Sequence, residues 1–123
     1  MLDTHAFLWA ITDDRRLTRQ ARRILETADL FLSVASIWEI ITKMQIGKLP
    51  LPDAPSKYLP RHVAALGAKL LAIETAHILR LEALPLHHRD PFDRLLVAQS
   101  LEEKLPLLSA DTLLDPYGAD IRW

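Results

Sequence analysis

The sequence predicts an α/β fold in which a mostly parallel sheet of four to five strands is flanked by helices. Short apolar runs rich in strand-forming residues alternate with stretches whose apolar residues recur at helical spacing. Such alternation is typical of βαβ units, so the strands are expected to run parallel, with helices on both faces of the sheet. Half of the 123 residues are hydrophobic, enough for one core, and we expect a single domain over residues 1–123.

In the first 47 residues, two strands and three helices are expected. The strands are residues 1–3 and 30–34, and the helices begin after Asp3 or Thr4, after Thr18 and at Ser36. The helices are recognised by apolar residues at helical spacing behind a capping Ser, Thr or Asp. Ser36-Ile37-Trp38-Glu39 has the spacing of a capping box, and Gly47 can end the helix that it opens.

The rest of the chain continues the same alternation after a linker. The strands are residues 69–73, 105–109 and 119–123, and the helices are a helical hairpin over 56–66, a helix after Thr75 and a helix over 91–104. The linker Leu49-Pro50-Leu51-Pro52 cannot be helical, because each proline also restricts its predecessor. Pro91 suits the first position of its helix, which makes Asp90 the N-cap and places Asp93 in the first turn.

Composition excludes several classes of site. The net charge is −1, so a nucleic-acid site would have to be a local basic patch. The chain has no cysteine, which excludes disulfides, thiolate zinc sites and cysteine nucleophiles. There is no basic stretch of a secretory signal at the start and no apolar run of the ~18 residues that a membrane span needs. We therefore expect a soluble cytoplasmic protein without a membrane partner.

Acidic residues are expected to meet at one edge of the sheet. In an open parallel sheet, the ligand site lies outside the carboxyl ends of the strands. The acids that follow strands or open helices at that edge are Asp3, Glu39, Asp93 and Asp111. Asp90 is a further candidate, although helix capping is a sufficient role for it. Like charges at short distance raise one another's pKa unless a cation neutralises them, so the sequence predicts a site for Mg²⁺ or Mn²⁺. Such an ion can polarise a phosphoryl oxygen and activate water.

Five motifs resemble the PIN-domain ribonucleases of the VapC toxin type. In chain order they are Leu2-Asp3-Thr4-His5-Ala6, Ser36-Ile37-Trp38-Glu39-Ile40, Gly47-Lys48-Leu49, His88-Arg89-Asp90-Pro91-Phe92-Asp93-Arg94-Leu95-Leu96 and Ser109-Ala110-Asp111. The resemblance implies a three-layer PIN-like fold in which Asp3, Glu39, Asp93 and Asp111 hold the Mg²⁺ or Mn²⁺ and carry catalysis. It also implies the toxin of a type II toxin–antitoxin system, which cleaves single-stranded RNA and is restrained by a VapB-type antitoxin. Together with the surplus of apolar residues, it predicts a homodimer that binds the antitoxin in a groove between apolar helices.

Other polar residues have weaker claims to a functional role. The hydroxyls of Thr4 and Ser109 are candidates to bind a metal-coordinated water or a phosphate, with capping or turn bonds as the alternative. Arg94, Lys43 and Lys48 are candidates for RNA contact, with solvated surface charge as the alternative. His87-His88 precede the acidic motif, but a soft-metal site would need further ligands to converge on them. A catalytically inactive PIN-like domain that serves as a binding or regulatory partner is the alternative function, and the four intact acids favour the nuclease.

Overall fold

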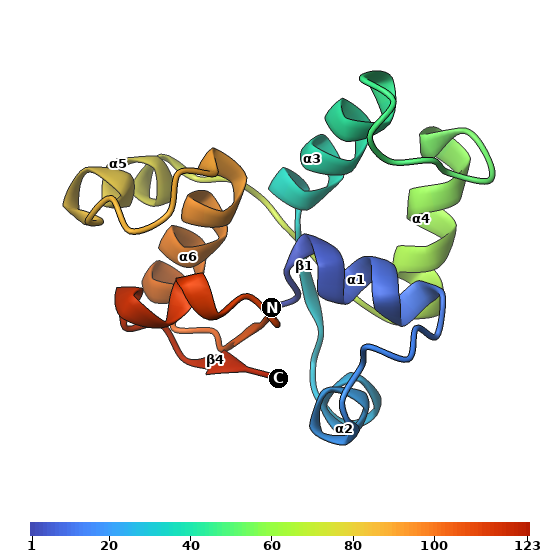
Figure 1. Cartoon of the computed structure of the whole chain (residues 1–123), viewed down its shortest axis with the longest axis horizontal. Helices are drawn as coiled ribbons and strands as arrows, with labels where there is room; N and C mark the ends of the chain where they lie inside the picture. The colour runs from blue at the N-terminus through green and yellow to red at the C-terminus, as the bar shows by residue number, and fades with distance from the viewer.

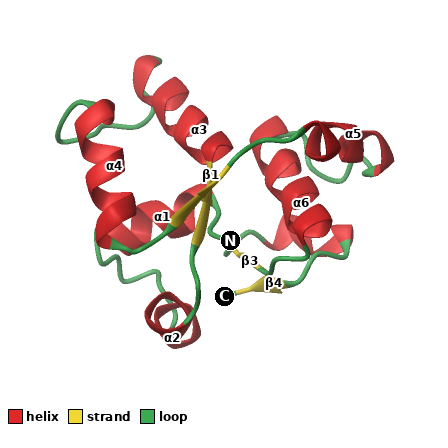
Figure 2. Ribbon diagram, turned by 180° about the vertical axis from the view of Figure 1, so that it is seen from behind, coloured by secondary structure: helices red, strands yellow, loops and turns green.

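The computed structural model describes all residues 1–123 as helices packed on both sides of short parallel strands. In chain order the elements are α1 (Thr4–Ile11), α2 (Arg19–Thr27), β1 (Phe31–Ser33), α3 (Val34–Gln45), α4 (Pro55–Ala65), β2 (Lys69–Leu71), α5 (Thr75–Ala83), α6 (Pro91–Glu103), β3 (Leu107–Leu108), the 3₁₀ helix η1 (Thr112–Tyr117) and β4 (Ile121–Arg122). Figure 1 shows α1, α2 and α4 on one side of the strands and α5 and α6 on the other. The view from behind in Figure 2 shows the same division. The predicted α/β class is confirmed.

The strands form two short parallel pairs that are joined only around Leu2. β1 pairs with β2, and β3 pairs with β4. The two pairs meet at Leu2, which forms single parallel bridges to Leu32 and to Leu108. The predicted strand at residues 1–3 is therefore reduced to one bridge, and the other predicted strands are two or three residues long. The parallel direction is confirmed, but a sheet of four to five strands is not.

Two buried clusters lie on opposite faces of these strands. One contains Leu2 and Leu108 with residues of α1 to α4, and the other contains Met1 and Leu107 with residues of α6 and η1. Successive residues of an extended chain point to opposite faces. The neighbours Met1 and Leu2, and likewise Leu107 and Leu108, therefore contribute to different clusters. This alternation explains why both faces of such short strands are covered by helices.

Helix α3 begins earlier than the sequence predicts. Its N-cap is Ser33, the last residue of β1, whose hydroxyl accepts from the Ala35 N–H at 3.0 Å. The predicted capping box at Ser36 and Glu39 is therefore wrong, because Ser33 already satisfies the helix start. Ser36 and Glu39 lie inside the helix, and both are buried.

Two further helix predictions are corrected by the structure. Residues 56–66 form one helix, α4, instead of a hairpin, although Pro60 lies inside it. Proline has no N–H to donate to the Ser56 carbonyl, but Pro60 and Ser56 are both exposed, so water can donate to this carbonyl instead. The N-cap of α5 is Glu74 rather than Thr75, and His77 Nδ1 accepts from the Glu74 N–H at 2.9 Å. A histidine at this position can replace the usual Glu of a capping box. None of the helices is long and apolar enough to span a bilayer.

Leu96 in α6 tests the second buried cluster. Its side chain is 0% exposed, whereas Leu86, in the loop before α6, is 86% exposed. We expect Leu96→Ala to lower the free energy of unfolding by about 2–5 kcal/mol, because the substitution removes buried contacts and leaves a cavity. Leu86→Ala is the matched control and should change stability by less than about 0.5 kcal/mol. Urea unfolding of both variants measures the difference, and equal losses would contradict this packing.

Candidate metal centre

The N-terminus of α6 separates the roles of its two aspartates. Asp90 is the N-cap, and its Oδ1 accepts from the N–H groups of Phe92 at 2.8 Å and Asp93 at 3.3 Å. Pro91 occupies the first helical position, where it has no N–H to leave unpaired. The predicted cap is confirmed. The Asp93 carboxylate takes no part in the cap, and it faces the neighbouring loop.

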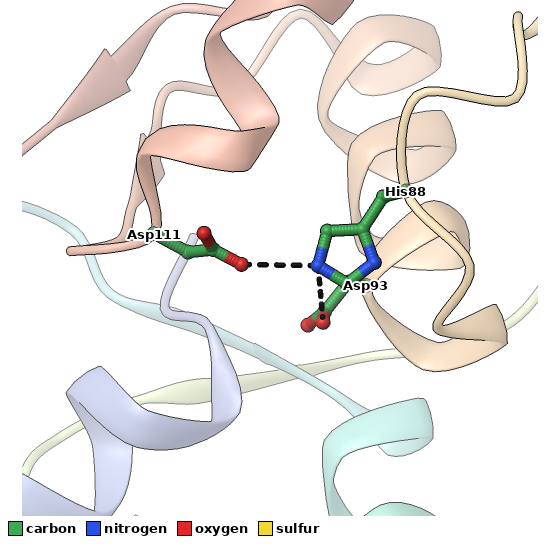
Figure 3. A group of neighbouring side chains, drawn as sticks. All are labelled: His88, Asp93 and Asp111. Carbon is green, nitrogen blue, oxygen red and sulfur yellow. Dashed lines mark hydrogen bonds and ion pairs between the residues drawn. The ribbon is translucent and has the colours of Figure 1, made fainter.

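Asp93 meets His88 and Asp111 at the point where the loop before α6 approaches η1 (Figure 3). His88 Nε2 lies 3.1 Å from Asp111 Oδ2 and 3.4 Å from Asp93 Oδ2. Ligand atoms of these three residues lie within 4.8 Å of one another. Asp111 is the N-cap of η1, where its Oδ1 accepts from the Leu113 N–H at 2.9 Å. The structure thus brings together two of the predicted acids and one histidine that the sequence did not assign to the site.

Asp3 lies at the start of α1, beside the same edge of the strands. It caps the helix by accepting from the Ala6 N–H, and only 5% of the residue is exposed. Burial raises the pKa of Asp3, which outweighs the lowering by hydrogen bonds from the Ala6 amide and the Ser109 hydroxyl. Asp3 and Asp111 line one cleft together with His5, Trp9 and Arg16. Asp3, the third predicted acid, therefore lies beside the group that contains Asp111.

Glu39 reaches the site from α3 and is 1% exposed. Its carboxylate accepts from the Thr4 hydroxyl through Oε2 and forms an ion pair with Lys43 through Oε1. The Thr4 hydroxyl also lies 3.1 Å from the Ser36 hydroxyl. Thr4 therefore has a defined role as a donor that fixes Glu39 against α1.

Among the acids of this site, Asp93 has a pKa that is raised to near neutrality. The pKa of Asp93 is raised to about 7, chiefly because the group is buried and further because of the negative charges of Asp90 and Glu39. Asp3 acts in the same direction more weakly, whereas His88 lowers the pKa. Carboxylates from α1, α3 and α6 thus lie close enough to destabilise the charged form of Asp93.

Comparison with known proteins decides the family. A family model described as the PIN domain matches residues 1–118. The chain belongs to the PIN domain family. Ribonuclease VapC16 of Mycobacterium tuberculosis is 31% identical over 68 residues, which are 55% of this chain. The matched region covers 45% of VapC16, so this PIN domain matches just under half the length of that relative.

A solved structure shows that the likeness extends over the whole fold. This PIN domain superposes with a TM-score of 0.72 on a chain of the crystal structure of VapBC2 from Rickettsia felis bound to a DNA fragment from their promoter. The match covers 99% of this chain and 96% of that chain, at 10% sequence identity. At this identity the likeness supports the fold alone. The resemblance to the VapC type that the five motifs predict is confirmed by the family match and by the similarity to ribonuclease VapC16.

The donors of this PIN domain fit a hard divalent cation. Asp3, Glu39, Asp93 and Asp111 offer carboxylate oxygens, which Mg²⁺ and Mn²⁺ prefer as ligands. Besides burial, the negative charges of Asp90, Glu39 and Asp3 raise the pKa of Asp93, whereas His88 lowers it. A cation would offset that repulsion. That all four acids hold one ion stays a prediction, because only Asp93 and Asp111 lie in the tight group with His88.

The remaining candidates have partners within the PIN domain. Ser109 Oγ accepts from the Asp111 N–H at 3.1 Å, and Lys43 is paired with Glu39. Arg94 donates to the carbonyls of Leu81, Leu84 and Pro85 and to the Tyr117 hydroxyl. Lys48 is exposed. Contact with RNA stays a prediction for Arg94, Lys43 and Lys48, and for the first two it would compete with these bonds.

Substitutions at Asp93 and Asp90 distinguish a repelled acid from a helix cap. In EDTA, we expect Asp93→Asn to be at least as stable as the wild type, because it removes one charge from a group of like charges. Asp90→Ala should be destabilised by about 1 kcal/mol, since it loses the cap of α6. Thermal unfolding of the three proteins measures both effects. An Asp93→Asn protein that unfolds well below the wild type would contradict the repulsion.

Proposed function

We propose that this PIN domain, over residues 1–123, is a Mg²⁺- or Mn²⁺-dependent endoribonuclease and the toxin of a type II toxin–antitoxin pair. The observation that carries the proposal is the grouping of acids from separate segments: Asp93 lies with Asp111, Asp3 lines a cleft with Asp111, and the charge of Glu39 acts on Asp93. Grouping acids from separate segments at one place lowers the stability of the fold. A metal-dependent phosphodiesterase needs this grouping, because the acids bind its ion. The similarity to ribonuclease VapC16 supports RNA as the substrate.

The residues of the site would each have a distinct task in hydrolysis. Asp3, Glu39, Asp93 and Asp111 would hold the ion. When bound, a divalent cation stabilises charge on the phosphoryl oxygens and lowers the pKa of a water that attacks in line. Asp90 fixes the first turn of α6 and thereby the direction of Asp93. Cleavage of this kind leaves a 5′-phosphate and a 3′-hydroxyl.

The alternative is a catalytically inactive PIN-like domain that acts only by binding. Such a domain would have no need to keep Asp3 and Glu39 buried as carboxylates, since burial of charge is costly. Uncharged residues of similar shape would suit it better. The cleavage assay below decides between the two functions.

Cleavage of single-stranded RNA should depend on the ion and on Asp93. We expect activity in millimolar Mg²⁺ or Mn²⁺ and none in excess EDTA. Asp93→Asn should lower the rate by about 100-fold or more, the scale seen when one charge-stabilising group is lost at a reacting centre. Asp90→Ala, with the cap lost but the acids of the site intact, should retain far more activity. Cleavage that continues in EDTA would contradict the metal mechanism.

A VapB-type antitoxin is the partner that we propose for the apolar groove between α3 and α4. Ile37 and Ile41 of α3 and Leu59 and Val63 of α4 line it, together with Leu70, which is 55% exposed. An amphipathic segment can bury its apolar face in such a groove. The structural neighbour is itself a VapBC complex, which supports an antitoxin partner for this chain. A homodimer is part of the same proposal.

Two exposed alanines test the groove. Ala64 lies on the wall of the groove near the end of α4, and Ala83 lies away from it at the end of α5. Coexpressed with the product of a small reading frame directly upstream, the wild type and Ala83→Glu should form a complex. Ala64→Glu should lose it, because a carboxylate would be buried without a partner. Light scattering measures the masses of the complex and of the expected dimer, and equal complex formation by both variants would contradict the groove.

A further inference from the structure

We propose that His88 is an N–H donor that takes the place of the cation between Asp93 and Asp111 in the metal-free protein, and that it does not bind the ion. This inference rests on the proposed metal site. His88 lies in the group of three candidate ligands, so simple proximity would make it a ligand. The hydrogen bond at the other nitrogen of its ring assigns it the opposite role.

The proton of His88 is located by the backbone of Asp90. The Asp90 N–H donates to His88 Nδ1 at 3.0 Å. A ring nitrogen that accepts a hydrogen bond carries no proton, and a neutral imidazole has one proton, which must then be on Nε2. His88 therefore presents an N–H, and not a lone pair, to the two carboxylates.

The position of Nε2 suits a donor shared by two acids. It lies 3.1 Å from Asp111 Oδ2 and 3.4 Å from Asp93 Oδ2, so one N–H faces two carboxylate oxygens (Figure 3). To bind a metal through Nε2, the proton would have to move to Nδ1. Two N–H groups would then face each other 3.0 Å apart, at Nδ1 and at Asp90.

The loop that carries His88 is held against η1 by hydrogen bonds. The His88 N–H donates to the Tyr117 hydroxyl at 2.7 Å, and Arg94 donates to the same hydroxyl at 3.1 Å. Tyr117 is buried in η1, the element that Asp111 caps. The His88 backbone and Asp111 are therefore fixed to the same short helix, and the hydrogen bond from Asp90 to Nδ1 directs Nε2 at the acids. Tyr117 and Arg94 are positioning residues in this arrangement.

The two roles predict opposite effects of removing the ring. If His88 were a ligand, His88→Ala would weaken metal binding. If it replaces the cation, the metal-free protein loses the group that offsets repulsion between Asp93 and Asp111. The variant should then bind the ion at least as tightly as the wild type does. His88→Gln keeps an N–H that can reach the same oxygens, so it should recover part of the stability of the metal-free protein that His88→Ala loses.

The first experiment reads the tautomer of His88 in the wild-type protein by ¹⁵N NMR of the imidazole, at about pH 8, where an ordinary histidine is neutral. His88→Gln assigns the signals. We expect the proton on Nε2 in the metal-free protein and also with saturating Mg²⁺. A proton on Nδ1 in either state overturns the proposal. This measurement on the metal-free protein stands even if the wild type binds no ion, a result that would overturn the proposed nuclease instead.

The second experiment is a titration with Mn²⁺, followed by calorimetry, of the wild type and His88→Ala. His62→Ala is the matched control, because His62 packs on Tyr58 outside the site. We expect the Kd for Mn²⁺ of His88→Ala to be no more than threefold weaker than that of the wild type, or tighter. A Kd weakened by more than threefold, with His62→Ala unchanged, makes His88 a ligand and overturns the proposal.

Discussion

The burial of negative charge at the edge where the strands end is the constraint on which the rest of the structure depends. Asp3 and Glu39 are both buried among segments that also form the core. A buried carboxylate is stable only if donors or positive groups compensate for the lost water. Here the Ala6 amide serves Asp3, and Thr4 and Lys43 serve Glu39. Because the contact between Thr4 and Glu39 joins α1 to α3, the site also holds these two helices together.

The parts of the fold that the sequence predicts are those decided locally. The start of α6 follows from Asp90 and Pro91 alone, since capping involves only the residues of the first turn. The lengths of the strands cannot be predicted in this way, because each strand pairs with a partner from a distant segment. Leu2 bridges segments near residues 32 and 108, and nothing within residues 1–3 shows that the contact is limited to one residue. The cap of α3 at Ser33 instead of Ser36 has a similar origin. Either serine could cap a helix, but β1 ends at Ser33, so the helix begins there.

The same distinction applies to the site. The sequence predicts that Asp93 and Asp111 converge, because both lie at element boundaries on one edge, and the structure brings them together. The ion pair of Glu39 with Lys43 was predictable in principle, since the two residues are four positions apart on a helix. The role of His88 was not. It depends on the approach of η1, whose Tyr117 holds the loop 29 residues away in the sequence.

The positive groups are distributed unevenly among the acids, and this decides where a cation would gain most. Glu39 already has the ammonium of Lys43, so an ion beside it would compete with a charge that is present. Asp93 and Asp111 share only the imidazole N–H of His88, and the pKa of Asp93 remains raised to about 7. An ion should therefore be held most strongly between α6 and η1, with Asp3 and Glu39 completing its surroundings. Since Asp3 begins α1, such an ion would link helices from the two buried clusters, and binding would stabilise both sides of the fold together.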